Sequence, residues 1–171
     1  GDVKCYASAA EAIKIAASTG DICAESISAS SLDITVSTGK VTVSDMTCDG
    51  NITIGVSTGK TYLTDIVCKN LISTGRTGDI SLKNVISTEK ISVERSTGDV
   101  TLDRCDAAEL YITTDTGDVK GSLLSPKIFL HDTDTGDVSL ILCDSADISI
   151  KTSTGDVSGT LLTPKMFSHK T

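Results

Sequence analysis

Apolar and polar residues alternate in short runs along the whole chain, and the runs recur at a nearly constant spacing. Val41-Thr42-Val43 and Ile52-Thr53-Ile54 are typical examples. A period of two is characteristic of strands with one buried face, and no apolar stretch has the period or the length of a helix. The pattern predicts two or three short β-strands in each recurring unit, with about five inward-facing side chains.

A Thr-Gly dipeptide separates these units and marks an internal repeat. It recurs every 19 or 20 residues, usually within Ser-Thr-Gly-Asp-Val or a close variant. Glycine tolerates positive φ better than other residues, so each copy is interpreted as a structural turn. The turn glycines are Gly20, Gly39, Gly59, Gly78, Gly98, Gly117, Gly136 and Gly155.

A unit of this length cannot bury its own apolar face, so neighbouring copies must stack. The sequence therefore predicts an all-β fold, a single-domain parallel β-solenoid (β-helix) of about nine coils. We expect the coil to be right-handed, as crossovers between parallel strands nearly always are. We expect residues 1–171 to form this one domain, as a fragment of a longer chain.

The repeat changes in the C-terminal half. Gly121 and Gly159 replace an apolar residue four positions after the turn glycine, and Pro126 and Pro164 follow five residues later. These copies alternate with ordinary ones, which gives a 38-residue super-repeat. A glycine inside a strand often marks a β-bulge, so we expect a bulge at each extra glycine.

Composition and charge exclude several functions. Ser and Thr supply 46 residues, whereas Tyr and Phe supply 5 and Trp is absent. The net charge of −8, without a basic cluster, argues against nucleic-acid binding, which depends on Lys and Arg contacts to phosphate. No apolar run approaches the roughly 20 residues of a membrane span, and we recognise no signal peptide.

The aspartates that follow the turn glycines form the best candidate metal site. Asp79, Asp99, Asp118, Asp137 and Asp156 share one position, and their mutual repulsion calls for turn N–H donors or a cation. Ca²⁺ prefers clustered carboxylate oxygens. The candidate Ca²⁺ ligands are Asp115, Asp118, Asp134 and Asp137. A solvated turn ladder is the alternative interpretation, and we favour it.

Two motifs resemble catalytic or ligating groups. Asp115-Thr116-Gly117 and Asp134-Thr135-Gly136 match the aspartic-protease triplet, but other copies carry Ser at the same position. His131 and His169 share a position two copies apart, too far for a common metal ion. We interpret the triplets as turn variants and the histidines as packing residues.

The cysteines and threonines also follow the repeat. Only Cys48 and Cys68 fall on adjacent coils at the same position, where a disulfide is geometrically conceivable. A Thr-x-Thr ladder begins at Thr114 and Thr116 and resembles ice-binding arrays, but earlier copies lack it. We expect buried thiols and a column of turn hydroxyls. The sequence shows no catalytic triad, phosphate loop or Cys-x-x-Cys pair, so we expect neither catalysis nor a cofactor.

The Ser-Thr-Gly-Asp-Val unit resembles a bacterial family of uncharacterised β-strand-repeat domains labelled as adhesins. This resemblance extends over essentially the whole chain and implies a β-solenoid of the cell surface or envelope, or a secreted one, without established catalytic residues. It implies a binding module for a glycan, a cell-wall polymer or a surface protein. The alternative is a structural spacer or assembly element that self-associates through its open coil ends.

Overall fold

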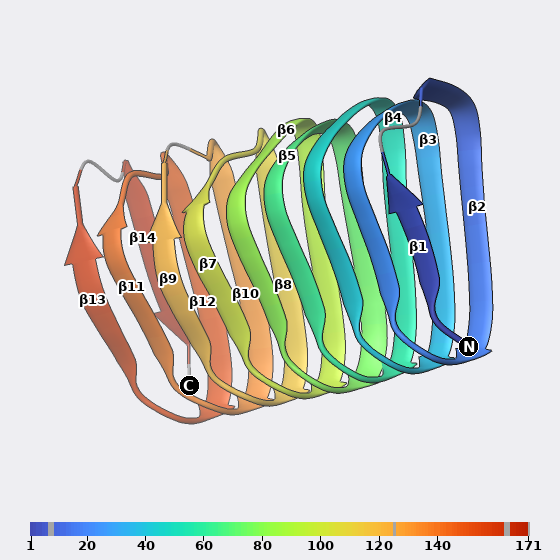
Figure 1. Cartoon of the computed structure of the whole chain (residues 1–171). Helices are drawn as coiled ribbons and strands as arrows, with labels where there is room; N and C mark the ends of the chain where they lie inside the picture. Colours follow the sequence, from blue (N-terminus) through green and yellow to red (C-terminus); the bar gives the residue numbers. More distant parts are fainter. Residues whose placement is uncertain (7–8, 125, 163–164, 171) are drawn as a thin grey trace.

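The computed structural model describes residues 1–6, 9–124, 126–162 and 165–170. Each secondary-structure element within these ranges is a β-strand, and the strands stack in parallel as a solenoid of about nine coils (Figure 1). The predicted fold class is thus confirmed. The strands are β1 (Val3–Tyr6), β2 (Ala9–Thr19), β3 (Ile22–Thr38), β4 (Val41–Thr58), β5 (Thr61–Thr77), β6 (Ile80–Thr97), β7 (Val100–Cys105), β8 (Glu109–Thr116), β9 (Val119–Leu123), β10 (Ile128–Thr135), β11 (Val138–Cys143), β12 (Asp147–Thr154), β13 (Val157–Leu161) and β14 (Met166–Lys170).

Two walls enclose the core. The first wall contains β1, the first halves of β3 to β6, and then β7, β9, β11 and β13. The second wall contains β2, the second halves of β3 to β6, and then β8, β10, β12 and β14. Each strand pairs in parallel with its equivalent in the adjacent coil, so equivalent residues form columns along the axis (Figure 1).

The strands are longer than the sequence pattern suggested. β3 to β6 each run for 17 or 18 residues, through both walls, without interruption. They bend rather than end between the walls, and at this corner the register of each strand pair shifts by one residue, for example between Ala29 and Leu32 of β3. One coil buries seven residues instead of about five: Ile22, Ala24, Ile27, Ala29, Leu32, Ile34 and Val36.

The Thr-Gly turn is stabilised by contacts between coils. Gly98 has a φ of 141°, as predicted for a left-handed turn residue, and its N–H donates to the Thr116 carbonyl of the next coil at 3.0 Å. A Cβ on Gly98 would collide with the Gly78 carbonyl. Glycine is therefore required here by its φ and by the close approach of the neighbouring turn.

A second left-handed residue, which the sequence analysis missed, bends each ordinary coil within the first wall. It lies six positions after the turn glycine and has a φ of 50–55°. These residues are Ser26, Asp45, Asp65, Asn84, Arg104 and Leu142. Asn and Asp tolerate this conformation better than most side chains, so the run of Ser, Asp and Asn was the available signal.

The extra glycines relocate this bend. Gly121 and Gly159 have φ values of 147° and 145°, two positions earlier than the bend of the neighbouring coils. The register shifts where β9 meets β7 and where β13 meets β11, which confirms the predicted irregularity. The Ser122 hydroxyl accepts the Arg104 N–H at 3.1 Å, so the shift leaves that donor satisfied.

Candidate functional site

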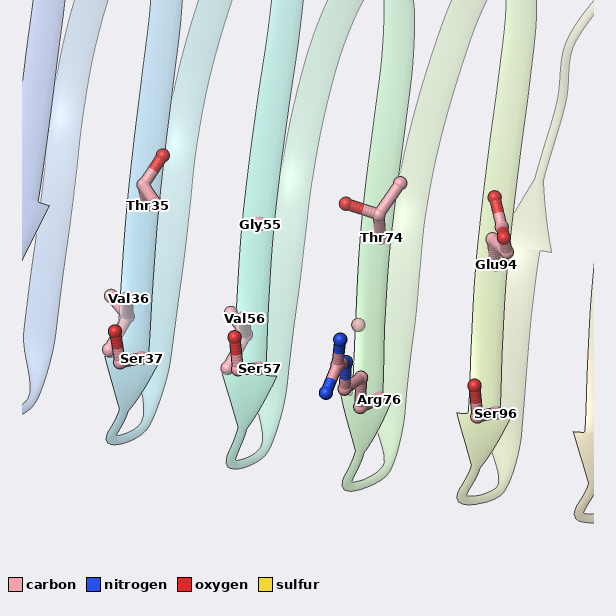
Figure 2. A pocket seen from close by; sticks show the side chains of 11 residues that line it. Thr35, Val36, Ser37, Gly55, Val56, Ser57, Thr74, Arg76, Glu94 and Ser96 are labelled. Atoms are coloured by element: carbon pink, nitrogen blue, oxygen red, sulfur yellow. The ribbon is translucent and has the colours of Figure 1, made fainter. Parts of the chain in front are cut away.

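A shallow groove lies on the second wall, at the ends of β3 to β6 just before the turns (Figure 2). We call it the hydroxyl groove. It is lined by Thr35, Val36, Ser37, Gly55, Val56, Ser57, Thr74, Gly75, Arg76, Glu94 and Ser96.

Two rows of side chains, one residue from each of four coils, form the groove (Figure 2). Thr35, Gly55, Thr74 and Glu94 are successive register partners and make one row. The second row runs parallel to it and nearer the turns, and consists of Ser37, Ser57, Arg76 and Ser96. Alternation along the strand places both rows outward, with the buried residues Val36 and Val56 between them.

Gly55 produces the notch in the groove. Its row partners Thr35 and Thr74 both project from the wall, whereas Gly55 has no side chain (Figure 2). A Cβ at Gly55 would meet only the Thr74 Oγ1 at 3.8 Å and the Ile34 carbonyl oxygen at 3.9 Å, which is ordinary contact. The notch is therefore open space, and the fold does not require it.

Arg76 supplies the groove's exposed cation. Its guanidinium lies on the side of its strand that faces Val56 and Ser57, away from Glu94 (Figure 2). No carboxylate of the described residues lies within ion-pair distance of it. The five donors of this planar group are thus available to a ligand.

A second arginine lies beneath the floor of the groove. Arg95 is only 2% exposed. It lies in an inward-facing column, whose members in the preceding coils are Val36, Val56 and Gly75. Its guanidinium donates to the Ser73 hydroxyl at 2.9 Å, the Thr61 hydroxyl at 3.3 Å and the Glu94 carbonyl at 2.9 Å.

All the hydrogen-bond acceptors of Arg95 are neutral. Among the described residues, no carboxylate forms an ion pair with this guanidinium. Burial lowers the pKa of Arg95 to about 10, which still leaves the group charged at neutral pH. The interior therefore holds a positive charge that protein dipoles solvate and no counter-ion neutralises.

The aspartate ladder is satisfied by backbone donors. The N–H of Asp118 donates to the Asp99 Oδ1 at 2.9 Å, and the N–H of Asp137 donates to the Asp118 Oδ1 at 3.0 Å. The same bond joins Asp156 to Asp137 at 2.9 Å. The expected turn N–H donors are therefore present, and they offset the repulsion within the column.

Lysines provide further compensation. Lys60 Nζ lies 2.8 Å from Asp79, and Lys120 Nζ lies 2.8 Å from Asp118. The hydrogen bond from Lys120 and then the N–H of Asp137 lower the pKa of Asp118. Lys60 and then the N–H of Asp99 lower the pKa of Asp79 in the same way.

The other two candidate Ca²⁺ ligands, Asp115 and Asp134, lie on the outer surface of β8 and β10. Within the described part of the chain, no three His, Cys, Asp or Glu side chains are grouped so that they could hold a metal ion. The Asp-Thr-Gly triplets that contain Asp115 and Asp134 occupy the ordinary turn position, in register with the other coils.

The two histidines occupy different environments. His131 is buried in β10 between Ile112 and Ile150, and its Nδ1 lies 3.2 Å from the Ile112 carbonyl oxygen. Burial lowers the pKa of His131 to about 4. His131 is a packing residue, as predicted, but His169 is exposed in β14, so that half of the prediction was wrong. Ile150 separates them, which confirms the predicted two-coil spacing.

Cys48 and Cys68 are register partners, as their spacing indicated, and both are buried as thiols. Burial raises the pKa of Cys68 to about 12. Cys105 pairs with Leu123 in the next coil and not with another cysteine.

The Thr-x-Thr ladder is not a surface array. Thr114, Thr133 and Thr152 point into the core, and the Thr114 hydroxyl lies 2.9 Å from that of Thr133. Only the second threonines, such as Thr116, are exposed. The expected column of turn hydroxyls is therefore half wrong, because strand alternation continues to the turn and places the first threonine inside.

The profile of the Toastrack DUF4097 family matches residues 60–161, more than half of the chain. The chain belongs to this Toastrack family. The matched region includes the β5 and β6 sides of the hydroxyl groove, with Arg76 and Arg95, but begins after Ser57. No curated protein and no solved structure matches the chain significantly. Within the described ranges of this Toastrack domain, no helix is long and apolar enough to cross a membrane.

Proposed function

We propose that this Toastrack solenoid is a non-enzymatic, adhesin-like binding module of the cell surface or of secreted protein, and that its hydroxyl groove binds a glycan chain. The observation that carries this proposal is the groove itself. Four consecutive coils present two parallel rows along the axis, in which six of the eight residues are Ser, Thr or Gly (Figure 2).

The groove matches the chemistry of a carbohydrate. Sugar hydroxyls both donate and accept hydrogen bonds, as do those of Thr35, Ser57 and Ser96. A linear polymer that lies along the axis would meet a similar pair of outward side chains at every coil, about 4.8 Å apart. The groove extends across four adjacent strands, β3 to β6, so it can hold an internal segment of a chain as well as its end.

Co-sedimentation of the purified domain with insoluble cell wall and with mucin-coated beads tests this proposal. The decisive variant is Gly55→Tyr, because the notch has room for a side chain that would then block the groove. The matched control is Thr101→Tyr on the first wall, where Tyr62 already occupies the same column two coils earlier.

We expect saturable binding that Gly55→Tyr reduces at least tenfold and that Thr101→Tyr leaves unchanged. Periodate, which cleaves the vicinal diols of mucin sugars, should abolish binding to mucin. Mucin binding that survives periodate but is lost when the mucin is treated with protease would identify a protein ligand and contradict the proposal. Binding that survives Gly55→Tyr would place the site elsewhere. A domain that binds none of these polymers would favour the structural-spacer function.

A further inference from the structure

We propose that the hydroxyl groove selects an acidic glycan, whose anionic oxygens are bound by Arg76 and further stabilised by the buried charge of Arg95. This inference rests on the proposed function and specifies its ligand class. It starts from a contrast between the groove and the rest of the protein.

The chain has a net charge of −8, with aspartates along the turns, and it contains three arginines. Two of the three, Arg76 and Arg95, lie in the groove or directly beneath it. Glu94 is the one carboxylate that lines the groove, so the lining is neutral and the floor adds a positive charge. The groove is therefore a locally positive site on an acidic molecule.

Arg76 has the geometry to bind an anion directly. Its guanidinium faces the Gly55 notch side of the groove and is unpaired among the described carboxylates (Figure 2). A planar guanidinium binds a carboxylate or phosphate through two parallel hydrogen bonds. The hydroxyl of Ser57 lies on the neighbouring strand β4 and that of Thr74 on β5 itself, where they can donate to the same anion or to adjacent sugar hydroxyls.

Arg95 contributes through the floor. Gly75 lines the groove, and the guanidinium of Arg95 lies where the Gly75 side chain would be, with Nη1 2.8 Å from the position of its Cβ. A single glycine backbone thus separates this charge from the groove. A charge with no counter-ion acts more strongly through the protein interior than through water, so it favours an anion above Gly75.

The test compares polygalacturonate with the same polymer after methyl esterification, which neutralises the carboxylates and keeps the sugar backbone. Polyglycerol phosphate is a third probe and distinguishes a phosphate source from a carboxylate source. Binding is measured with the intact domain by calorimetry at two salt concentrations. The variants are Arg76→Gln, Arg95→Thr and Glu94→Gln. Threonine occupies the Arg95 column natively at Thr114, so Arg95→Thr is compatible with the fold.

The control is Lys83→Gln, which removes an exposed positive charge from the first wall. We expect polygalacturonate to bind at least tenfold more tightly than its methyl ester, with an affinity that falls as salt rises. Arg76→Gln should weaken binding at least tenfold and Arg95→Thr several-fold. Glu94→Gln should strengthen it, and Lys83→Gln should have no effect. Tighter binding of polyglycerol phosphate would identify phosphate as the preferred anion.

Three outcomes would overturn the inference. Equal binding of polygalacturonate and its methyl ester would contradict the selection of an acidic glycan, but it would still support glycan binding. The absence of binding to all three polymers would count against both proposals. An effect of Lys83→Gln equal to that of Arg76→Gln would mean that net charge, and not the groove, attracts the polymer. Circular dichroism of each variant confirms that the solenoid is intact.

Discussion

Arg95 occupies the space that a side chain on Gly75 would need. The two residues are register partners on β6 and β5, and both belong to a column that points into the core. A Cβ on Gly75 would lie 2.8 Å from the Arg95 Nη1 and 2.5 Å from the Val56 carbonyl oxygen. The fold therefore accommodates a long buried cation only because the preceding coil has no side chain at this position.

This dependence predicts that the two positions are energetically coupled. Gly75→Ala should lower the free energy of unfolding by about 2 kcal/mol, as overpacking of a dense interior does. In the background of Arg95→Thr the same substitution should cost less, because the shorter side chain leaves room for the methyl group. Part of the cost should remain, since the contact with the Val56 carbonyl is unchanged. Urea denaturation of the four proteins measures the coupling, and strictly additive effects would contradict it.

The buried His131 predicts a loss of stability in mild acid. The pKa of His131 is lowered from 6.5 to about 4 by burial, so the unfolded chain binds a proton between these pH values and the folded protein does not. The contribution of His131 to the free energy of unfolding is fully present above about pH 6.5. It falls as the pH approaches 4, by about 3 kcal/mol in total.

The measurement is the free energy of unfolding of the native protein and of His131→Ile, at intervals from pH 7 to pH 4. Isoleucine occupies the same column at Ile112 and Ile150, so it should fit without strain. The variant should lose most of this dependence. An identical pH profile for the two proteins would assign the acid sensitivity to other groups. The lowered pKa values of Asp79 and Asp118 reduce the free energy of unfolding only below about pH 4, so their effect is separated from that of His131.

The aspartate ladder predicts different effects for neighbouring carboxylates. Asp118→Ala should cost about 1 kcal/mol, because it removes the acceptor of the Asp137 N–H and the partner of Lys120. Asp118→Asn keeps an acceptor oxygen and should cost less. Asp115→Ala, on the exposed surface of β8, should change stability by less than about 0.5 kcal/mol. Thermal unfolding ranks the three variants, and equal losses at Asp115 and Asp118 would argue against the ladder.

Thiol reactivity should follow burial. Burial raises the pKa of Cys68 to about 12 and the pKa of Cys105 and of Cys143 to about 11, so few thiolates are present near neutral pH. Cys5 and Cys23, which are only partly buried, should be alkylated before the buried thiols in the folded protein. Mass spectrometry after timed alkylation at pH 8 gives the order, and the buried thiols should react only on unfolding. Rapid labelling of Cys68 would contradict this packing.

The repeat explains why the stacking could be predicted and the groove could not. Spacing determines which residues share a column, so the pairing of Cys48 with Cys68 followed from counting. Arg95 lies in an inward column, but arginine is normally a surface residue, and its burial depends on what the neighbouring coil leaves empty. The notch of the groove arises from the missing side chain at Gly55, and the missing side chain at Gly75, on the next coil, makes room for Arg95 beneath it. A repeat pattern describes what the coils have in common and does not show where one coil differs from the others. In this chain the candidate site is formed by residues that differ from the repeat.

The shifted bends at Gly121 and Gly159 limit which coils this solenoid can gain or lose without a change in the contacts between coils. The ordinary strand β7 meets β9 with bends that lie two residues apart, and the Ser122 hydroxyl accepts the N–H of Arg104 at the β7 bend. β11 and β13 repeat this junction. Loss of the coil that carries Gly121 would bring the bends at Arg104 and Leu142 into register, as in the stacked strands β3 to β7, and would leave the Arg104 N–H without the Ser122 hydroxyl, whereas loss or duplication of a pair of coils keeps both kinds of junction. In this half of the protein the smallest unit that keeps the alternation of junctions is therefore 38 residues rather than 19.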